Sequence, residues 1–317
     1  MQRRHFALML AASAALASGV AMAKDYPDSP VTIIVPYAAG GVSDIMGRAL
    51  GQALSKQLGQ SVIIENKPGA AGAMGVLDIK RARPDGYRLT LTPAGIFRQP
   101  HVQKVQYDPV KDVRYIATFM TYDFVITVPP DSPFKTVKEL VDYAKAHPGE
   151  ITYGTPGNYT GNHIAMAALE KATGAQFTHV PFKGDSETIN AVLGKQIKVG
   201  VFANSAHTYI QSGKLRALAT TADKRPPAFG TIPTLRESGY PIDIPSPNGL
   251  AGPKGLPDAI VTKLQNAVKA AMDDPDFQKQ LTMNAVRPYY LDSAAYTKFA
   301  AEMFKREGEI VKGLTLN

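Results

Sequence analysis

Three short loops combine glycines and hydroxyl side chains in positions suited to binding an anion. They cover Tyr37 to Ser43, Thr155 to Thr160 and Lys183 to Asp185, and each lies between a run that predicts a strand and one that predicts a helix. In an open α/β sheet the ligand crevice lies at the carboxyl ends of the strands. Helix N-termini there offer unpaired N–H groups and roughly half a positive charge. The pattern therefore predicts that backbone donors and hydroxyls hold a carboxylate without a dedicated arginine.

Any one of these loops is weak evidence, because a single glycine-rich loop is more often a plain turn. The prediction depends on the fact that several such loops occur at equivalent positions, each at the end of a predicted strand. If two lobes face one another, these helix starts are directed at one cleft, and glycine lets the backbone approach the ligand closely.

Other polar and aromatic residues have ordinary structural interpretations. Asp44 and Arg48 are four residues apart on a predicted helix, which favours a surface ion pair over a ligand role. His163 lies in the first turn of a helix beside the second loop, where a buried or capping role is at least as well supported as ligand contact. His179 falls in a predicted strand and is expected to be structural. Three aromatic residues end apolar strands and fit the core and the cleft wall equally well: Tyr37, Phe182 and Phe202.

The sequence lacks the local signatures of the common enzyme classes. There is no G-x-S-x-G elbow, no H-E-x-x-H, no P-loop and no G-x-G-x-x-G. Cysteine is absent, and the histidines at 101, 147, 163, 179 and 207 show no metal-binding spacing. We expect a binding protein without cofactor or metal, and not an enzyme. An exported hydrolase remains an alternative, because catalytic triads are assembled in space.

The first 23 residues predict an export signal. Arg3 and Arg4 precede the apolar stretch Phe6 to Val20, and Ala21 to Ala23 form an A-x-A cleavage site, so the mature chain is expected to begin at Lys24. The paired arginines fit a Sec or a twin-arginine signal. No other apolar run reaches the roughly 20 residues needed to span a bilayer. The expected location is therefore the periplasm.

Charge favours a small anion over a nucleic acid as partner. The formal charge is +8, or +6 without Arg3 and Arg4, and such a balance steers anions towards the protein. Lysines and arginines are dispersed and form no basic stripe alternating with aromatics, which argues against nucleic-acid binding.

Alternating strands and helices predict an α/β fold built from two units. The first unit has expected strands at 31–35, 61–65 and 88–92 and helices at 43–58 and 70–83, an order that implies a parallel sheet. The second has expected strands at 124–128, 151–154, 178–182, 199–202 and 215–220, and helices that begin after the cap Thr136 and cover 162–173 and 185–193. The proline-rich run 241–257 is expected to be loop or extended chain. Helices are expected at 258–272, 275–282 and 293–313, the last capped by a serine, with a weak strand at 287–291.

At 317 residues the chain is too long for one ordinary core. The helical tail is too small for a third domain and is expected to pack on the first unit. The prediction is lobe 1 from 24–124 plus 247–317, lobe 2 from 125–246, and a ligand cleft between them.

A set of motifs spread over nearly the whole mature chain resembles one known family. In lobe 1 the motifs are Ile33 to Gly41 with Ser43, Asp44 and Arg48, then Glu65 to Ala70 with Gly72, and Pro84 to Tyr87. In lobe 2 they are Gly157, Asn158 and His163, then His179 to Gly184, Leu215 to Ala219, and Pro233 to Leu235 with Glu237, Gly239 and Tyr240. Together they resemble the substrate-binding receptors of tripartite tricarboxylate transporters, also called Bug-type (Bordetella uptake gene) receptors.

The resemblance implies a two-lobe, type II-like periplasmic binding protein that closes on its ligand like a hinged trap. The implied ligand is a small organic anion, either a di- or tricarboxylate or an aromatic carboxylate, and the implied partners are the membrane subunits of a secondary transporter. The same fold could instead report to a two-component sensor kinase. A monomer is expected.

The resemblance also implies which residues bind the ligand. The first loop contacts one carboxylate through backbone N–H groups, the other two loops contribute from lobe 2, and the segment 93–96 and the strand end at 203–204 line the cleft. The expected ligand-binding residues are Tyr37, Ala38, Ala39, Gly40, Gly41, Ser43, Ala94, Thr155, Gly157, Asn158, Tyr159, Thr160, His163, Phe182, Lys183, Gly184, Asp185, Ala203 and Asn204.

Two positions depart from the family pattern. Lys198 stands where the family usually has an acidic residue, and Ser246 to Gly249 stand where it often has a tryptophan. Either departure could alter the class of ligand.

Overall fold

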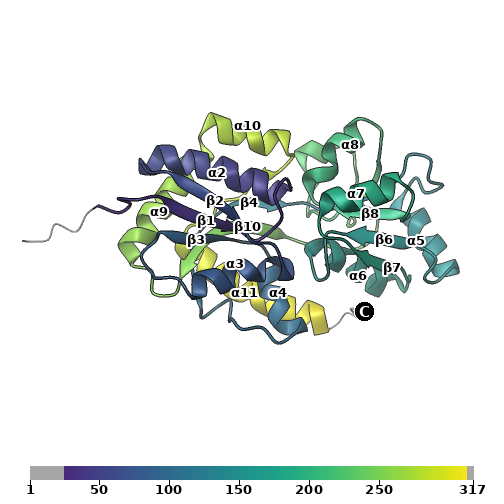
Figure 1. Cartoon of the computed structure of the whole chain (residues 1–317). Helices are drawn as coiled ribbons and strands as arrows, with labels where there is room; N and C mark the ends of the chain where they lie inside the picture. The colour runs from purple at the N-terminus through teal and green to yellow at the C-terminus, as the bar shows by residue number, and fades with distance from the viewer. Residues whose placement is uncertain (1–24, 313–317) are drawn as a thin grey trace, which may run out of the picture.

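Two β-sheets lie side by side, and helices cover both (Figure 1). The computed structural model describes residues 25–312, so the predicted signal peptide and Gly313 lie outside the described residues. The α/β class expected from the alternation of strands and helices is confirmed. Within residues 25–312, no helix has the length and apolar character needed to cross a bilayer.

The larger sheet has six strands in the order β11-β4-β10-β3-β1-β2. Their bounds are β1 (Val31–Val35), β2 (Val62–Asn66), β3 (Arg88–Thr92), β4 (Val113–Tyr122), β10 (Ser246–Pro253) and β11 (Arg287–Pro288). The smaller sheet has the order β7-β6-β8-β5-β9, with β5 (Val125–Val128), β6 (Thr152–Thr155), β7 (Thr178–Pro181), β8 (Val199–Phe202) and β9 (Arg216–Thr220). The chain therefore passes from the six-stranded to the five-stranded sheet after β4 and returns before β10.

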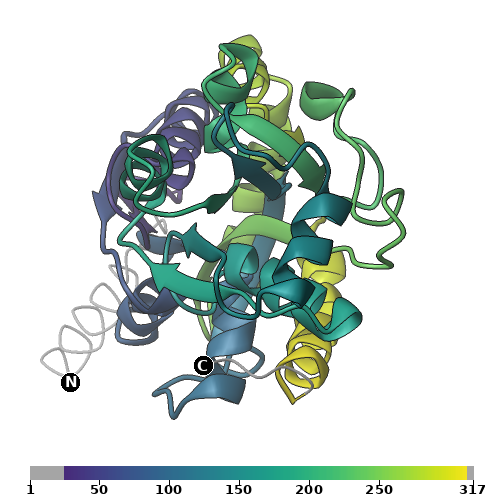
Figure 2. The same cartoon turned by 90° about the vertical axis from the view of Figure 1, so that its right-hand side faces the viewer.

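The helices have the following bounds: α2 (Val42–Leu58), α3 (Ala73–Lys80), α4 (Gly95–Val102), α5 (Val137–Ala146), α6 (Gly161–Thr173), α7 (Asp185–Leu193), α8 (His207–Gln211), α9 (Asp258–Met272), α10 (Pro275–Met283) and α11 (Ser293–Lys312). In Figure 1, α2 and α10 lie above the six-stranded sheet, and α3, α4 and α11 lie below it. Figure 2 looks onto the five-stranded half, with α5 to α8 around its sheet. The C-terminal helices pack on the six-stranded side, as expected.

Strand β1 and helix α2 form because their apolar residues recur with the right periods. The β1 run is apolar and β-branched, and it pairs in parallel with β2 and β3. In α2, Met46, Leu50 and Leu54 are four residues apart and at most 1% exposed. Burying each such side chain contributes about 1.5–3 kcal/mol. Gly59 ends the helix in the left-handed conformation at φ 67°. This packing fixes the start of α2 at the carboxyl end of β1.

The parallel order expected for the first three strands is confirmed, because β1 pairs in parallel with β2 and β3, but each sheet as a whole is mixed. Strand β10 runs antiparallel to β3 and β4, and β5 runs antiparallel to β8 and β9. The run 241–257, expected to be loop or extended chain, contains the central strand β10. The prolines of this run argued against a strand in the sequence, yet Pro247 and Pro253 both occupy buried positions of β10.

Two further expectations need correction, and three elements were not expected. The helix expected over 70–83 is interrupted, because Ala70, Ala71 and Gly72 have positive φ, and α3 covers only Ala73–Lys80. The cap of α11 is Asp292, whose Oδ1 accepts a hydrogen bond from the Ala295 N–H at 2.9 Å, and not a serine. Strand β4 and helices α4 and α8 were not expected at all. Thr136 does cap α5, as predicted.

Candidate ligand-binding pocket between the two sheets

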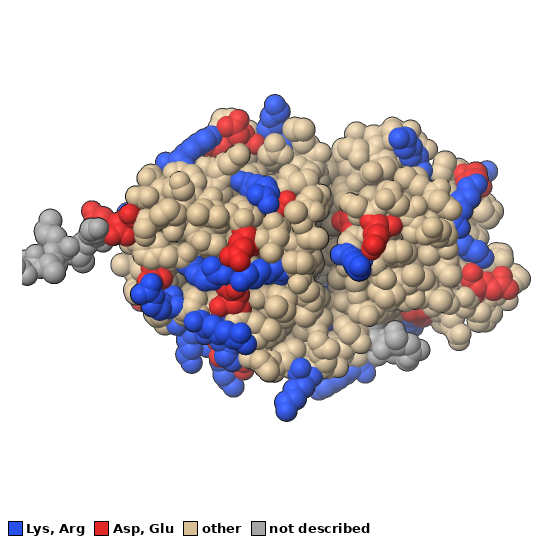
Figure 3. Space-filling view, viewed as in Figure 1, with Lys and Arg blue, Asp and Glu red and all other residues tan. Residues whose placement is uncertain are grey.

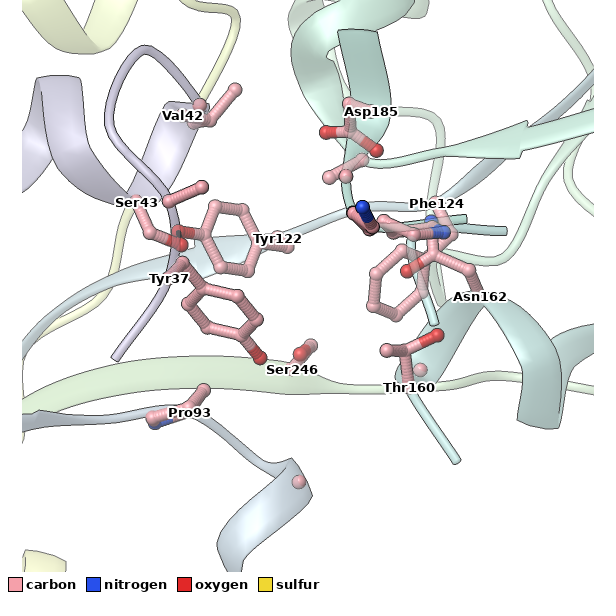
Figure 4. Close-up of a pocket in the computed structure, with 18 of the residues that line it drawn as sticks. Tyr37, Val42, Ser43, Pro93, Tyr122, Phe124, Thr160, Asn162, Asp185 and Ser246 are labelled. Carbon is pink, nitrogen blue, oxygen red and sulfur yellow. Dashed lines mark hydrogen bonds between the residues drawn. The ribbon is translucent and has the colours of Figure 1, made fainter. Parts of the chain in front are cut away.

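A cavity of about 310 Å³ lies between the two sheets and takes its walls from both. On the six-stranded side it is lined by the start of α2 and by the segment after β3, and on the five-stranded side by the starts of α6 and α7 and the end of β8. The segments that cross between the sheets add Tyr122, Phe124 and Ser246 (Figure 4). Figure 3 shows the groove between the two halves, bordered mainly by residues other than Lys, Arg, Asp and Glu. Three helix starts thus converge on one cavity.

The start of α2 presents unused backbone donors. The N–H groups of Gly41, Val42 and Ser43 donate to no atom within the described residues, whereas the Gly40 N–H is taken by Asp44 Oδ2 at 3.0 Å. These three residues line the cavity. The helix start therefore has the donors and partial positive charge expected of an anion site.

Asp44 holds this loop in place. Its carboxylate pairs with Arg48 at 2.9 Å and accepts a hydrogen bond from Asn66 Nδ2 at 2.9 Å. These partners keep the pKa of Asp44 below its usual value, although burial works against them. The ion-pair interpretation of Asp44 and Arg48 is thus confirmed.

Hydroxyl groups line the same wall. Ser43 Oγ and Tyr122 Oη are 2.8 Å apart, and in Figure 4 the Tyr37 hydroxyl points towards Ser246. Burial raises the pKa of Tyr37 to about 12 and raises that of Tyr122 still further. Both phenols therefore stay protonated at physiological pH and can donate a hydrogen bond.

Helix α6 supplies the opposite wall. Thr160 caps the helix by accepting a hydrogen bond from the His163 N–H, and Asn162 Nδ2 donates to the Val201 carbonyl at 2.9 Å. Gly161 lies against the Phe124 ring so closely that a Cβ would sit 2.2 Å from it. Only glycine fits there, and it lets the helix start and the Phe124 ring lie together at the cavity.

Helix α7 brings a carboxylate into the wall. Asp185 is the first residue of the helix, and its Oδ2 accepts a hydrogen bond from Ser205 Oγ at 2.7 Å. Its Oδ1 is buried and has no partner among the described residues. Burial raises the pKa of Asp185 to about 6, although the Ser205 hydrogen bond works against this. The Lys183 N–H, an expected ligand donor, is taken by Glu187 Oε2 at 2.9 Å.

The expected site residues divide into two sets. Those that line the cavity are Tyr37, Ala38, Ala39, Gly41, Ser43, Ala94, Thr160, Lys183, Gly184, Asp185 and Ala203. Those that do not line it are Gly40, Thr155, Gly157, Asn158, Tyr159, His163, Phe182 and Asn204. Ligand contact remains a prediction for every one of them.

The second set supports the wall from behind. His163 stacks on His179 with ring centroids 3.9 Å apart, and its Nδ1 accepts a hydrogen bond from the Tyr159 N–H at 3.1 Å. Burial lowers the pKa of His163 to about 3 and that of His179 to about 4, so both rings are neutral. His179 Nε2 lies 2.7 Å from Thr155 Oγ1. The histidine pair thus orders the loop before α6.

Sequence reasoning singled out half of the lining residues. Four more lie inside the expected segments 37–43, 93–96 and 155–160 without having been singled out: Val42, Pro93, Gly95 and Pro156. The residues missed altogether are Tyr122, Phe124, Gly161, Asn162, Ser186, Glu187 and Ser246. Most are neighbours of expected residues, so wider loops would have included them. Tyr122 and Ser246 belong to strands that the patterns did not reveal. The departure noted at Ser246 to Gly249 was the available signal, because a missing tryptophan there changes a wall of the pocket.

A buried arginine connects the two halves beside the pocket. Arg98 on α4 is 0% exposed and forms a two-bond pair with Glu307 on α11, with both distances 2.7 Å. Its Nη1 also donates to the Tyr159 carbonyl at 2.7 Å, in the loop of the five-stranded half. Glu307 neutralises the guanidinium, so Arg98 positions the loop and adds little free positive charge to the pocket.

The chain matches a known receptor family over most of its length. The model of the tripartite tricarboxylate transporter family receptor matches residues 46–316. A relative from Cupriavidus necator, called "UPF0065 protein in gbd 5'region", is 43% identical over 323 aligned positions, which cover 100% of this chain and 99% of the relative.

Solved structures show the same fold. The periplasmic binding protein BugD has a TM-score of 0.84 and 31% identity, covering 90% of this chain and 98% of BugD. Rpa4515 from R. palustris, solved with adipate, has a TM-score of 0.85 at 25% identity, covering 91% and 98%. MatC from Rhodopseudomonas palustris, with bound malate, has a TM-score of 0.82 at 26% identity, covering 90% and 100%. The fold is thus that of periplasmic binding proteins, as the motifs implied.

Proposed function

The chain belongs to the tripartite tricarboxylate transporter receptor family, and from this premise we propose that it captures a small organic carboxylate in the periplasm for a transporter of that type. The convergence of the α2, α6 and α7 starts on one cavity of about 310 Å³ carries the proposal. Each start offers backbone N–H groups to an anion, and the wall adds hydroxyls that hydrogen-bond carboxylate oxygens.

The ligand class proposed is a di- or tricarboxylate or an aromatic carboxylate. It is supported by the adipate and malate bound to two similar proteins of the same fold. Apolar groups such as Phe124 and Pro93 lie beside the donors, which suits a ligand with a carbon skeleton between or beside its carboxylates. The relatives are binding proteins, and binding without turnover is proposed here too.

We also propose that the two sheets are the cores of two lobes that hinge about residues 124 and 246. A ligand gripped by both walls stabilises the closed form, and the membrane subunits of the transporter recognise that form. The crossing segments support this idea, because only the chain between β4 and β5 and that between β9 and β10 connect the sheets within residues 25–312.

A thermal-shift and calorimetric screen of mono-, di- and tricarboxylates tests the proposal. A ligand at about 100 times its dissociation constant adds roughly 2.7 kcal/mol to the free energy of unfolding. We expect at least one acid to raise the melting temperature and neutral sugars to leave it unchanged. If no acid in the panel raises the melting temperature, the proposal that this protein binds a carboxylate is wrong.

A blocking variant localises the site. Ala39→Trp fills the mouth of the pocket at an exposed position of the first loop and should lower affinity at least tenfold with little change in stability. Ala146→Trp is the matched control, because Ala146 is also exposed but lies at the end of α5, away from the cavity. Equal affinity of the two variants would place the ligand elsewhere.

A further inference from the structure

Asp185 puts a negative charge into the wall of a pocket that is proposed to bind an anion. The residue is half-buried and lines the cavity, and Figure 4 shows its carboxylate across from Val42 and Ser43. One oxygen has the Ser205 hydroxyl as partner, and the other has none among the described residues. A hydroxyl compensates a carboxylate far less than a cation does.

The other charged groups around the pocket do not neutralise Asp185. Lys183 and Glu187, on the same helix start, have opposite charges and are both exposed. Across the cavity, Tyr37 and Tyr122 are uncharged phenols. Within the described residues, the Ser205 hydrogen bond is what favours the ionised form of Asp185.

The nearby ionic groups of the six-stranded half are already paired. Arg98 is held by Glu307, and Asp44 is held by Arg48. The α7 start contributes a partial positive charge that acts on Asp185 and on any bound anion alike. An ionised Asp185 is therefore an uncompensated charge that faces the ligand.

Resting on the proposed function, we propose that Asp185 determines the specificity of the pocket, selecting carboxylates that also carry an ammonium group over plain dicarboxylates of the same length. An ammonium supplies the missing positive charge, whereas a second carboxylate meets a like charge in a site partly shielded from water. A plain dicarboxylate enters only when a proton from solvent binds the Asp185 carboxylate.

The two ligand types then respond oppositely to pH. With a pKa of about 6, about 1% of Asp185 is protonated at pH 8 and half at pH 6. Apparent affinity scales with the competent fraction, so a plain dicarboxylate should bind about 50-fold more tightly at pH 6 than at pH 8. The affinity of the amino analogue should fall by no more than about twofold over the same range, because the ionised form that it prefers drops to half.

Titration calorimetry with two matched pairs tests this: succinate with aspartate, and adipate with 2-aminoadipate, each at pH 8 and pH 6. The wild-type protein should bind the amino member of a pair at least tenfold more tightly at pH 8. Asp185→Asn should reduce this preference to about twofold. The variant should also bind the plain dicarboxylate about 100-fold more tightly than wild type at pH 8, and only about twofold more tightly at pH 6. A plain dicarboxylate that binds equally well at both pH values, to both proteins, overturns the proposal.

Stability without ligand separates this inference from the proposed function. The folded pKa of Asp185 is above its unfolded value of 3.8, so the native state binds the extra proton, and the charge destabilises the fold progressively from pH 4 to 6 and fully above that. Asp185→Asn should therefore have a higher melting temperature than wild type at pH 8 and the same melting temperature as wild type at pH 4. Asp142→Asn, at an exposed ion pair on α5, is the control and should not melt above wild type at pH 8. If no acid binds, the proposed function fails, whereas the absence of a melting difference at pH 8 refutes the uncompensated charge itself.

Discussion

At the scale of single residues, the buried Arg98–Glu307 ion pair should be highly sensitive to the loss of either partner. Both side chains are at most 3% exposed, and removing one partner of such a pair leaves an uncompensated buried charge. We expect Glu307→Gln to lower the free energy of unfolding by about 3–5 kcal/mol, measured by urea denaturation.

The exposed Lys138–Asp142 pair provides the comparison for this prediction, since exposed pairs contribute about 0–1 kcal/mol. The Arg98 guanidinium also donates to the Tyr159 carbonyl, so the Glu307→Gln variant should lose ligand affinity along with stability. A loss of stability no greater than that of Asp142→Asn contradicts the importance of the pair.

Sequence reasoning identified part of the pocket because the α2, α6 and α7 starts carry local signals. Glycines and hydroxyls beside a helix start are visible in a few consecutive residues. Tyr122, Ser246 and the Asp185–Ser205 pair are different, because each depends on segments that meet only in space. The charge imbalance at Asp185 could not be predicted, since it depends on which cations are absent nearby.

At the scale of elements, β10 lies at the centre of the six-stranded sheet and tolerates no bulk at Gly249. A Cβ there would lie 2.3 Å from the Tyr296 ring, which is itself buried and hydrogen-bonded to Thr92. We expect Gly249→Ala to destabilise the protein by about 1–3 kcal/mol through overpacking. Gly230→Ala is the matched control, because its nearest atom would be 3.6 Å away. Equal unfolding midpoints for the two variants would disprove the close contact.

The elements that sequence patterns predicted are those with local signals. Strand β1 is continuously apolar, and α9 carries an apolar stripe with buried Val261, Leu264 and Val268. Strand β10 lacks such a signal, because glycines and prolines fill it and its stability comes from pairing with β3 and β4 on both sides. Helix α4 contains Pro100, which a pattern-based interpretation takes as a helix breaker.

At the scale of the whole molecule, the pocket should respond to ligand by a change in shape. Both walls must contact the ligand at once, and within residues 25–312 the chain passes from one sheet to the other only at the two crossing segments. We expect small-angle X-ray scattering to show a smaller radius of gyration when a tight-binding carboxylate is added. An unchanged radius at saturation, with binding confirmed by calorimetry, would exclude hinge closure.

The return of the chain to its first sheet also constrains the order of folding. Strands β5 to β9 are contiguous between Val125 and Thr220, so the five-stranded sheet can form from nearby parts of the chain. The larger sheet is complete only when β4 has paired with β10, which begins much later in the chain at Ser246. Loop-closure entropy delays such distant pairings. The smaller sheet should therefore gain amide protection first during refolding, and the N-terminal strands should remain exposed until the C-terminal segment arrives.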